Sequence, residues 1–184
     1  MRTIQTIGHS THPIEEFLAM LRAHDVQHLV DVRTVPKSRH NPQFAKENLQ
    51  PAIEEAGLRY TYMGTTLGGF RRPQPDSPNM AWRNTSFRGY ADYMQTPQFA
   101  EALTQLESIA EKQCTAIMCA ESMPWRCHRS LIADALIARG WTVYEIMSMA
   151  PAKLRKLPEW ACVTHGRVTY PLSERLNFPV NENH

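Results

Sequence analysis

The stretch TAIMCAESMPWRCHRSLIADALIARGWTVYEI, residues 115–146, decides the fold class because it contains a strand, a helix and a second strand in succession. Residues 115–118 form a short apolar run that predicts a buried strand. Residues 125–139 have helical spacing, and residues 141–146 again predict a strand. The helix positions expected to face inward are Leu131, Ile132, Ala135 and Leu136. A helix between two strands is typical of parallel strand pairing.

The remainder of the chain repeats this alternation. Apolar runs predict three more strands at residues 2–7, 28–33 and 58–63. Amphipathic spacing predicts a helix that starts at Pro13, a helix over residues 48–56, and a helix over residues 96–110. Five strands alternating with helices predict an α/β fold. We expect a Rossmann-like, mostly parallel five-stranded sheet with helices on both faces.

The chain of 184 residues has the length of one domain. We expect an α/β domain over residues 1–148 and a small C-terminal extension over residues 149–184, packed on that domain and carrying a hairpin at 163–168. Residues 64–89 are rich in Gly, Pro and Arg and are too long for an ordinary connection. This segment is therefore interpreted as either a functional flap or a disordered segment.

Composition excludes several protein classes. Hydrophobic residues make up 42% of the chain and charged residues 21%, which is atypical of a disordered chain. No apolar run approaches the roughly 20 residues of a membrane helix, and the N-terminus resembles a strand rather than a signal peptide. We therefore expect a cytoplasmic protein with no membrane partner. Its four cysteines are then expected to be reduced thiols.

Net charge argues against general binding of polyanions, because it is only +2. The charge is unevenly distributed, however: residues 33–90 contain nine Lys or Arg against four acids. This basic stretch leaves a more local interaction with an anion open.

Chemically unusual residues follow three of the predicted strands. Because ligands of open parallel sheets bind beyond the carboxyl ends of the strands, we expect these residues to gather at one edge. They are His9 and Ser10 after the first strand, Asp31, Arg33, Arg39 and Asn41 at the second, and Cys119, Glu121, Trp125, Arg126, Cys127, His128 and Arg129 after the fourth.

The last of these groups contains the candidate catalytic residues. Cys127 is expected near a helix N-terminus, beside His128 and between two arginines, an environment that lowers the pKa of a thiol and makes it a nucleophile. Cys119 is the alternative nucleophile, and His128 or Glu121 the acid or base. The arginines would hold an anion.

Each candidate also has a structural interpretation. Either cysteine is equally consistent with a small buried apolar residue, and His128 with a core histidine that is hydrogen-bonded. Asp31 and Arg33 share a strand face and would pair with each other, and the arginines after the fourth strand would pair with Glu121. Seven residues separate Cys119 from Cys127, which fits no standard zinc spacing, so no metal ligands are assigned.

Aromatic side chains accompany the basic flap. Trp82, Phe87, Tyr90 and Tyr93 are interleaved with arginines, a pattern that would stack bases of single-stranded nucleic acid. The alternative is that these rings pack the flap onto the core. Tyr90 and Trp125 are included among the candidate binding residues.

Several motifs in order resemble one known family. They are Thr6-Ile-Gly-His-Ser10, Leu29-Val-Asp-Val-Arg33, Ser38-Arg-His-Asn-Pro-Gln-Phe44, Gly89-Tyr-Ala-Asp-Tyr-Met94, Met118-Cys-Ala-Glu121 and Pro124-Trp-Arg-Cys-His-Arg129. This set resembles the bacterial and archaeal domain-of-unknown-function family 488, over about residues 3–147 except for much of 71–86. The resemblance implies an α/β domain and supplies no reaction.

Three functions remain open from the sequence. The favoured one is an enzyme, a transferase or hydrolase with a cysteine nucleophile, that binds a small anionic or nucleotide-like ligand. The second is a nucleic-acid-associated protein that uses the basic stretch 33–90. The third is a metal- or haem-binding protein that uses Cys127, His128, His9 or Glu121. No residue pattern specifies a particular cofactor or an oligomeric state.

Overall fold

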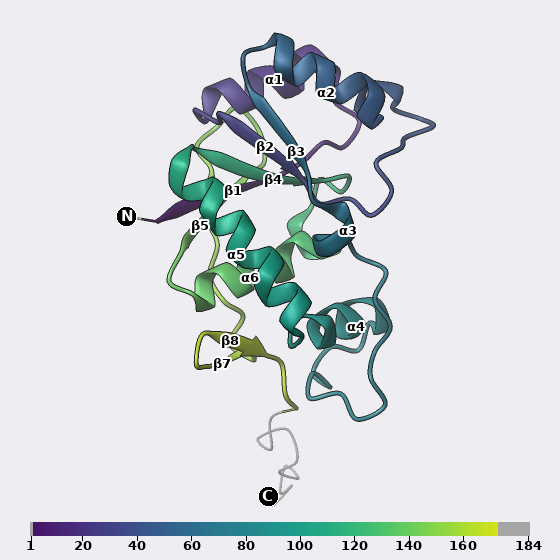
Figure 1. Ribbon diagram of the computed structural model, residues 1–184, viewed down its shortest axis with the longest axis vertical. Coiled ribbons are helices and arrows are strands. Elements are labelled where there is room, and N and C mark those ends of the chain that lie inside the picture. The colour runs from purple at the N-terminus through teal and green to yellow at the C-terminus, as the bar shows by residue number, and fades with distance from the viewer. Residues whose placement is uncertain (1, 173–184) are drawn as a thin grey trace, which may run out of the picture.

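The computed structural model describes residues 2–172 and shows an α/β fold built on a six-stranded sheet (Figure 1). The strand order is β3-β2-β4-β1-β5-β6. All five predicted strands are present and pair in parallel, and β6 adds a short antiparallel edge to β5. The strands are β1 (Thr3–Gly8), β2 (His28–Asp31), β3 (Arg59–Tyr62), β4 (Thr115–Cys119), β5 (Thr142–Ile146) and β6 (Lys153–Leu154).

Helices cover both faces of this sheet, as the alternation predicts. In Figure 1, α1 and α2 lie on one face, and α5 and α6 lie on the other. The helices are α1 (Ile14–Ala23), α2 (Lys46–Glu55), α3 (Gly64–Leu67), α4 (Thr85–Tyr93), α5 (Pro97–Lys112) and α6 (Arg129–Ala138). Among the described helices, none is long and apolar enough to cross a membrane.

The alternation of side chains along each strand divides the core into two layers. In β4, Met118 packs against the α1 and α2 layer, whereas Ile117 and Cys119 face the α5 and α6 layer. Phe17 and Leu21 of α1 are fully buried, as their spacing predicts. Helices therefore cover both faces of the central strands, which leaves the ends of the sheet as the places where a reactive site could lie.

The strand order itself brings the predicted edge residues together. β4 lies between β1 and β2, with Gly8 opposite Cys119 and Asp31 opposite Met118. The usual nucleotide-binding sheet instead pairs the first strand directly with the second. As a result, Cys119 lies between the chain segments that follow β1 and β2.

The helix predicted from residue 125 begins four residues later. Pro124–Arg126 forms a single 3-10 turn, and Cys127 then adopts an extended backbone with φ −136° and ψ 145°, which interrupts the helix. α6 starts at Arg129, with His128 at its N-cap. Cys127 therefore precedes the first turn of α6.

Residues 64–89 form an ordered segment that Asp92 of α4 holds in place. The buried Asp92 carboxylate accepts hydrogen bonds from the Gln74 N–H at 2.7 Å, the Ser77 hydroxyl at 2.6 Å and the Asn79 amide at 2.7 Å. The flap interpretation is thus compatible with the structure. The segment also includes two helices that the sequence did not predict, α3 and part of α4.

The aromatic residues of this segment pack internally. Trp82 contacts Phe87, Trp160 and Tyr170, with ring centroids 4.7–5.6 Å apart. Tyr90 and Tyr93 both pack against Phe99. These contacts agree with the core-packing interpretation of the rings, of which Tyr90 is buried and the other three are half-buried.

The described part of the C-terminal extension packs on α6. The predicted hairpin is present as β7 (Cys162–Thr164) and β8 (Arg167–Thr169). Tyr170 is fully buried, and its hydroxyl donates to Asp134 at 2.6 Å. Residues 173–184 of the predicted extension lie outside the described residues, and the boundary at residue 148 stays a prediction.

We predict that Asp92→Ala lowers the free energy of unfolding by about 2–4 kcal/mol, because two buried donors and one partly buried donor lose their carboxylate acceptor. Urea denaturation measures this loss, and limited proteolysis should become faster within residues 70–84. The exposed Asp76 provides the matched control, and Asp76→Ala should change stability by less than about 0.5 kcal/mol. Equal effects of the two variants would contradict the role of Asp92.

Candidate functional site

The carboxyl edge of the sheet, where β1, β4 and β2 end, contains seven of the predicted site residues. Their side chains are buried or half-buried. They are His9, Asp31, Arg33, Cys119, Cys127, His128 and Arg129. The backbone connects the three segments: the His9 N–H donates to the Cys119 carbonyl at 2.9 Å, and the Val32 N–H donates to the Met118 carbonyl at 3.0 Å. The sequence prediction that these groups converge is thus what the geometry shows.

Asp31 and Arg33 form a closed pair. The Arg33 guanidinium donates twice to the Asp31 carboxylate, at 2.9 and 2.7 Å, and once to the Phe44 carbonyl at 2.7 Å. The Tyr60 hydroxyl donates to the same carboxylate at 2.5 Å. Both partners are buried, and the pairing that their shared strand face predicts is present; Arg33 Nη1 also lies 3.4 Å from His9 Nε2.

His9 stacks on Phe44 beside this pair. The ring centroids are 4.2 Å apart, and His9 Nδ1 lies 2.8 Å from the Ser10 carbonyl. Burial, with a smaller contribution from the Arg33 charge, lowers the pKa of His9 to about 4. His9 is therefore neutral near pH 7. Phe44 and Tyr60 were not among the predicted site residues. The only sequence signal for Phe44 was its place in a motif of the family, and Tyr60 had none.

Arg129 is the one fully buried arginine among the described residues, and its partners are unusual. Its Nη1 donates to the Cys119 sulfur at 2.6 Å and to the Glu121 carbonyl, and its Nη2 donates to the Ser122 carbonyl at 3.0 Å. Its Nε has no hydrogen-bond partner within residues 2–172. The Glu121 side chain is exposed, so Arg129 meets the backbone of Glu121 and not its carboxylate.

The other well-buried arginines have carboxylate partners. Arg33 pairs with Asp31 at 2.7 Å, and Arg155 pairs with Asp134 at 2.9 Å. In the described part of the chain, no carboxylate lies within ion-pair distance of Arg129. Because a buried cation is unfavourable without an anion, the Cys119 sulfur is the group that can supply the negative charge.

The two thiols differ in their tendency to ionise. Burial by itself raises the pKa of Cys119, but the neighbouring Cys127 thiol and the charge of Arg129 outweigh it and lower this pKa to about 7. Proximity to Cys119, together with burial, raises the pKa of Cys127. Of the two nucleophiles that the sequence offers, Cys119 is the one that contacts a buried arginine, through Arg129 Nη1.

His128 is positioned to exchange a proton with Cys127. Its Nε2 lies 3.0 Å from the Val32 carbonyl, which can only accept, so we assign the ring proton to Nε2. Nδ1 then presents its lone pair to the Cys127 sulfur, 3.5 Å away. Burial lowers the pKa of His128 to about 4, so the ring is neutral near pH 7.

Gly8 allows this close packing, and Gly69 lies beside His128. A Cβ at Gly8 would come within 1.8 Å of the Glu121 carbonyl oxygen and 2.8 Å of Arg129 Nη1. A Cβ at Gly69 would lie 3.4 Å from His128 Nδ1. Only glycine at Gly8 lets the loop after β4 cross the end of β1 at this distance.

The remaining predicted residues lie around the buried group or beneath it. Tyr90 is buried under His128 and donates to the Leu67 carbonyl, a packing role. Ser10 contributes its backbone N–H to the Ala120 carbonyl at 3.0 Å. The side chains of Arg39, Glu121, Trp125 and Arg126 are exposed, and that of Asn41 is half-buried.

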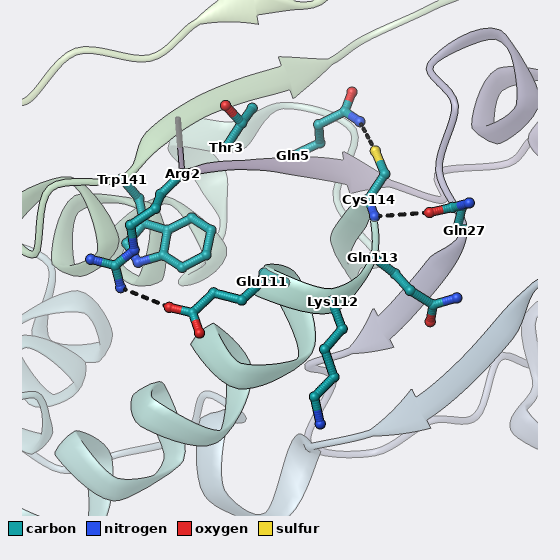
Figure 2. A pocket seen from close by; sticks show the side chains of 10 residues that line it. Arg2, Thr3, Gln5, Gln27, Glu111, Lys112, Gln113, Cys114 and Trp141 are labelled. Atoms are coloured by element: carbon teal, nitrogen blue, oxygen red, sulfur yellow. Dashed lines mark hydrogen bonds and ion pairs between the residues drawn. The ribbon is translucent and has the colours of Figure 1, made fainter.

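A surface hollow lies at the opposite, amino edge of the sheet (Figure 2). Its volume is about 420 Å³, and Figure 2 shows the polar groups that line it. These groups already contact one another: Gln5 donates to the Cys114 sulfur at 3.2 Å, and Arg2 pairs with Glu111 at 3.4 Å. Burial raises the pKa of Cys114. We therefore place the candidate site at the carboxyl edge because of the residue types found there, although the hollow lies at the amino edge.

Comparison with known families matches residues 13–136 to the family described as Domain of unknown function DUF488. The chain belongs to this family. The match covers more than half of the chain and includes every site residue except His9 and Ser10. Comparisons with curated proteins and with solved structures give no match. Membership of the DUF488 family agrees with the motif resemblance and adds no reaction.

We predict that the protein loses stability as the pH falls from 6.5 to 4. The pKa of His9 and of His128 is about 4 when folded and about 6.5 when unfolded, so over this range the unfolded chain binds more protons and is favoured. The loss is about 3 kcal/mol at most per histidine. Urea denaturation across this pH range measures it.

The variant His128→Gln should flatten this pH dependence, whereas His40→Gln, at an exposed position, should leave it unchanged. An unchanged slope in His128→Gln would show that His128 is not held neutral by the fold.

Proposed function

We propose that this DUF488 protein is an enzyme that acts on a small anionic or nucleotide-like molecule through a thiolate at Cys119. The single observation that supports it is the fully buried Arg129, which has the Cys119 sulfur in place of a carboxylate. A thiolate stabilised by a buried cation is a nucleophile near neutral pH. A structural cysteine in an apolar core would have no such partner.

The surrounding groups have separate roles in this proposal. Cys119 attacks the electrophilic atom of the substrate, and Arg129 stabilises the thiolate before the attack. The Cys127 thiol stays protonated and, as the neighbour of Cys119, limits the basicity of the Cys119 sulfur. His128 accepts or returns a proton at Nδ1. The Asp31–Arg33 pair and Phe44 hold the ends of β1 and β2 in position and do not touch the substrate.

The substrate class follows from what is exposed around this edge. Arg33 and Arg129 are fully engaged inside the protein, so an anion would be bound by the exposed Arg126 and Arg39. Trp125 is 64% exposed and Phe70 is 85% exposed, and each offers a flat face to a planar ring. Phe70 follows Gly69, which lies against His128.

Access to Cys119 requires motion of the loop over residues 120–126. Cys119 is only 2% exposed, because this loop covers it. The contacts that retain the loop are the carbonyl groups of Glu121 and Ser122 on Arg129 and the carbonyl of Ala120 on the Ser10 N–H. We propose that the loop opens for substrate and closes over the thiolate.

We predict a thiolate with a midpoint near pH 7. Absorbance at 240 nm reports thiolate without any need for access to the sulfur. The titration of the wild type minus that of Cys119→Ser should show one step near this pH. Cys114→Ser is the matched control and should leave that step intact, because the pKa of Cys114 is raised. A difference step at pH 9 or above would overturn the proposal.

We also predict that ligand binding depends on Arg126. A thermal shift panel of nucleoside phosphates and small carboxylates should contain a stabilising compound. Arg126→Ala should weaken its binding about tenfold, the order of one charge-assisted contact. Arg22→Ala, at an exposed position of α1, should not. No stabilisation by any compound, or equal weakening in both variants, would contradict the assigned ligand class.

A further inference from the structure

Cys119 and Cys127 are two thiols placed side by side in the same layer of the core. Cys119 ends β4, Cys127 lies two residues before α6, and both belong to the same buried cluster, where each thiol shifts the pKa of the other as a direct neighbour. Both side chains are buried, at 2% and 7% exposed, and both are in the reduced form. The proposed function uses only one of these sulfurs as a nucleophile, so the second needs its own explanation.

Each sulfur has the neighbour that a two-step oxidation requires. Arg129 contacts Cys119 and stabilises it as a thiolate, which is the form that reacts with peroxides. His128 Nδ1 lies 3.5 Å from Cys127 and can take its proton. Redox-sensing cysteines are typically thiolates placed next to such a resolving cysteine.

We propose that a hydroperoxide oxidises this pair to a reversible Cys119–Cys127 disulfide, which switches off the Cys119 nucleophile. The inference rests on the proposed thiolate at Cys119 and adds regulation of the same site. The oxidant is a hydroperoxide such as hydrogen peroxide, which reaches Cys119 when the 120–126 loop opens. A cellular thiol would reverse the reaction by thiol–disulfide exchange.

The chemistry balances in two steps. The Cys119 thiolate attacks one peroxide oxygen, the O–O bond breaks, and Cys119 becomes a sulfenic acid, while the departing hydroxide becomes water by taking up the proton that Cys119 released to the solvent when it ionised. Cys127 then loses its proton to His128 Nδ1 and attacks the Cys119 sulfur. The S–S bond forms, the S–O bond breaks, and the departing hydroxide takes the proton from His128 as water. Two thiols and one hydrogen peroxide thus give one disulfide and two waters.

The other two cysteines are unsuitable partners. Cys114 lies before β4, at the amino edge of the sheet, where it contacts Gln5. Cys162 is exposed on β7 in the C-terminal hairpin. Within residues 2–172, neither thiol has a basic side chain or a second sulfur as a hydrogen-bond partner. Oxidation is therefore expected to be selective for the Cys119 and Cys127 pair.

The test uses the full chain carrying Cys114→Ser, reduced and desalted, then treated with a small molar excess of hydrogen peroxide and quenched by alkylation. Trypsin releases residues 113–126 and residues 127–129 as separate peptides, so in this background each contains one of the two thiols. We expect a non-reducing digest to contain these peptides linked, two hydrogens lighter than their sum. Dithiothreitol should release them.

Matched variants in the same background identify the resolving thiol. With Cys127→Ser, the linked peptide should disappear and a sulfenic acid at Cys119 should accumulate, trapped by dimedone. Cys162→Ser should give the same linked peptide as the parent. Circular dichroism confirms that each variant is folded. Over-oxidation of Cys119 in the parent without the linked peptide, or linkage through Cys162, would overturn the inference.

The two proposals fail in different ways. A step near pH 7 at 240 nm together with no linked peptide would leave the Cys119 nucleophile in place and remove only the redox switch. The absence of that step would remove the nucleophile, and a linked peptide formed nonetheless would be ordinary oxidation of neighbouring thiols, so the switch would be removed with it.

Discussion

A guanidinium with no exposed surface needs a negative partner, and at the carboxyl edge of this sheet that partner is a sulfur atom. Arg129 is held by the Cys119 sulfur and by two loop carbonyls. Carbonyl dipoles solvate a cation only in part, so the charge balance depends on a thiolate. The same contact ties α6 to the end of β4 and holds the loop between them. Stability of the edge and reactivity of the thiol therefore have one origin.

The edge is otherwise arranged to be electrically neutral. Asp31 cancels the charge of Arg33, and burial keeps the imidazoles of His9 and His128 uncharged near pH 7. Among the described groups of this edge, the Cys119 sulfur beside Arg129 is then the one whose charge a reaction could change. Neutral surroundings strengthen the attraction between Arg129 and a Cys119 thiolate, because no other net charge among the described groups nearby screens it and the effective dielectric of the interior is low.

The strand order explains why these groups meet. With β4 between β1 and β2, the loop after β4 is flanked by His9 on one side and by the Asp31–Arg33 pair on the other. Gly8 then permits the loop to cross the end of β1 against Arg129. If β1 and β2 were neighbours, as in the usual nucleotide-binding sheet, Cys119 would not lie between these two segments.

Local pattern determined much of this protein. Apolar runs located all five parallel strands, helical spacing located α1, α2 and α5, and the strand-end rule brought the reactive residues to one edge. These features depend on near neighbours in the chain and on the periods of helices and strands. The start of α6 was misplaced, because helical spacing continues through Cys127 although its backbone is extended.

Only the tertiary structure distinguishes the two cysteines. In sequence, Cys127 lies beside His128 and two arginines, which favours it, whereas Arg129 is ten residues from Cys119. The fold directs the Arg129 side chain back to Cys119 and places the Cys127 thiol beside the same sulfur, which is why our proposal assigns the thiolate to Cys119. The physical reason is that the ionisation of a buried group is set by the charges and donors in contact with it, and folding chooses those contacts.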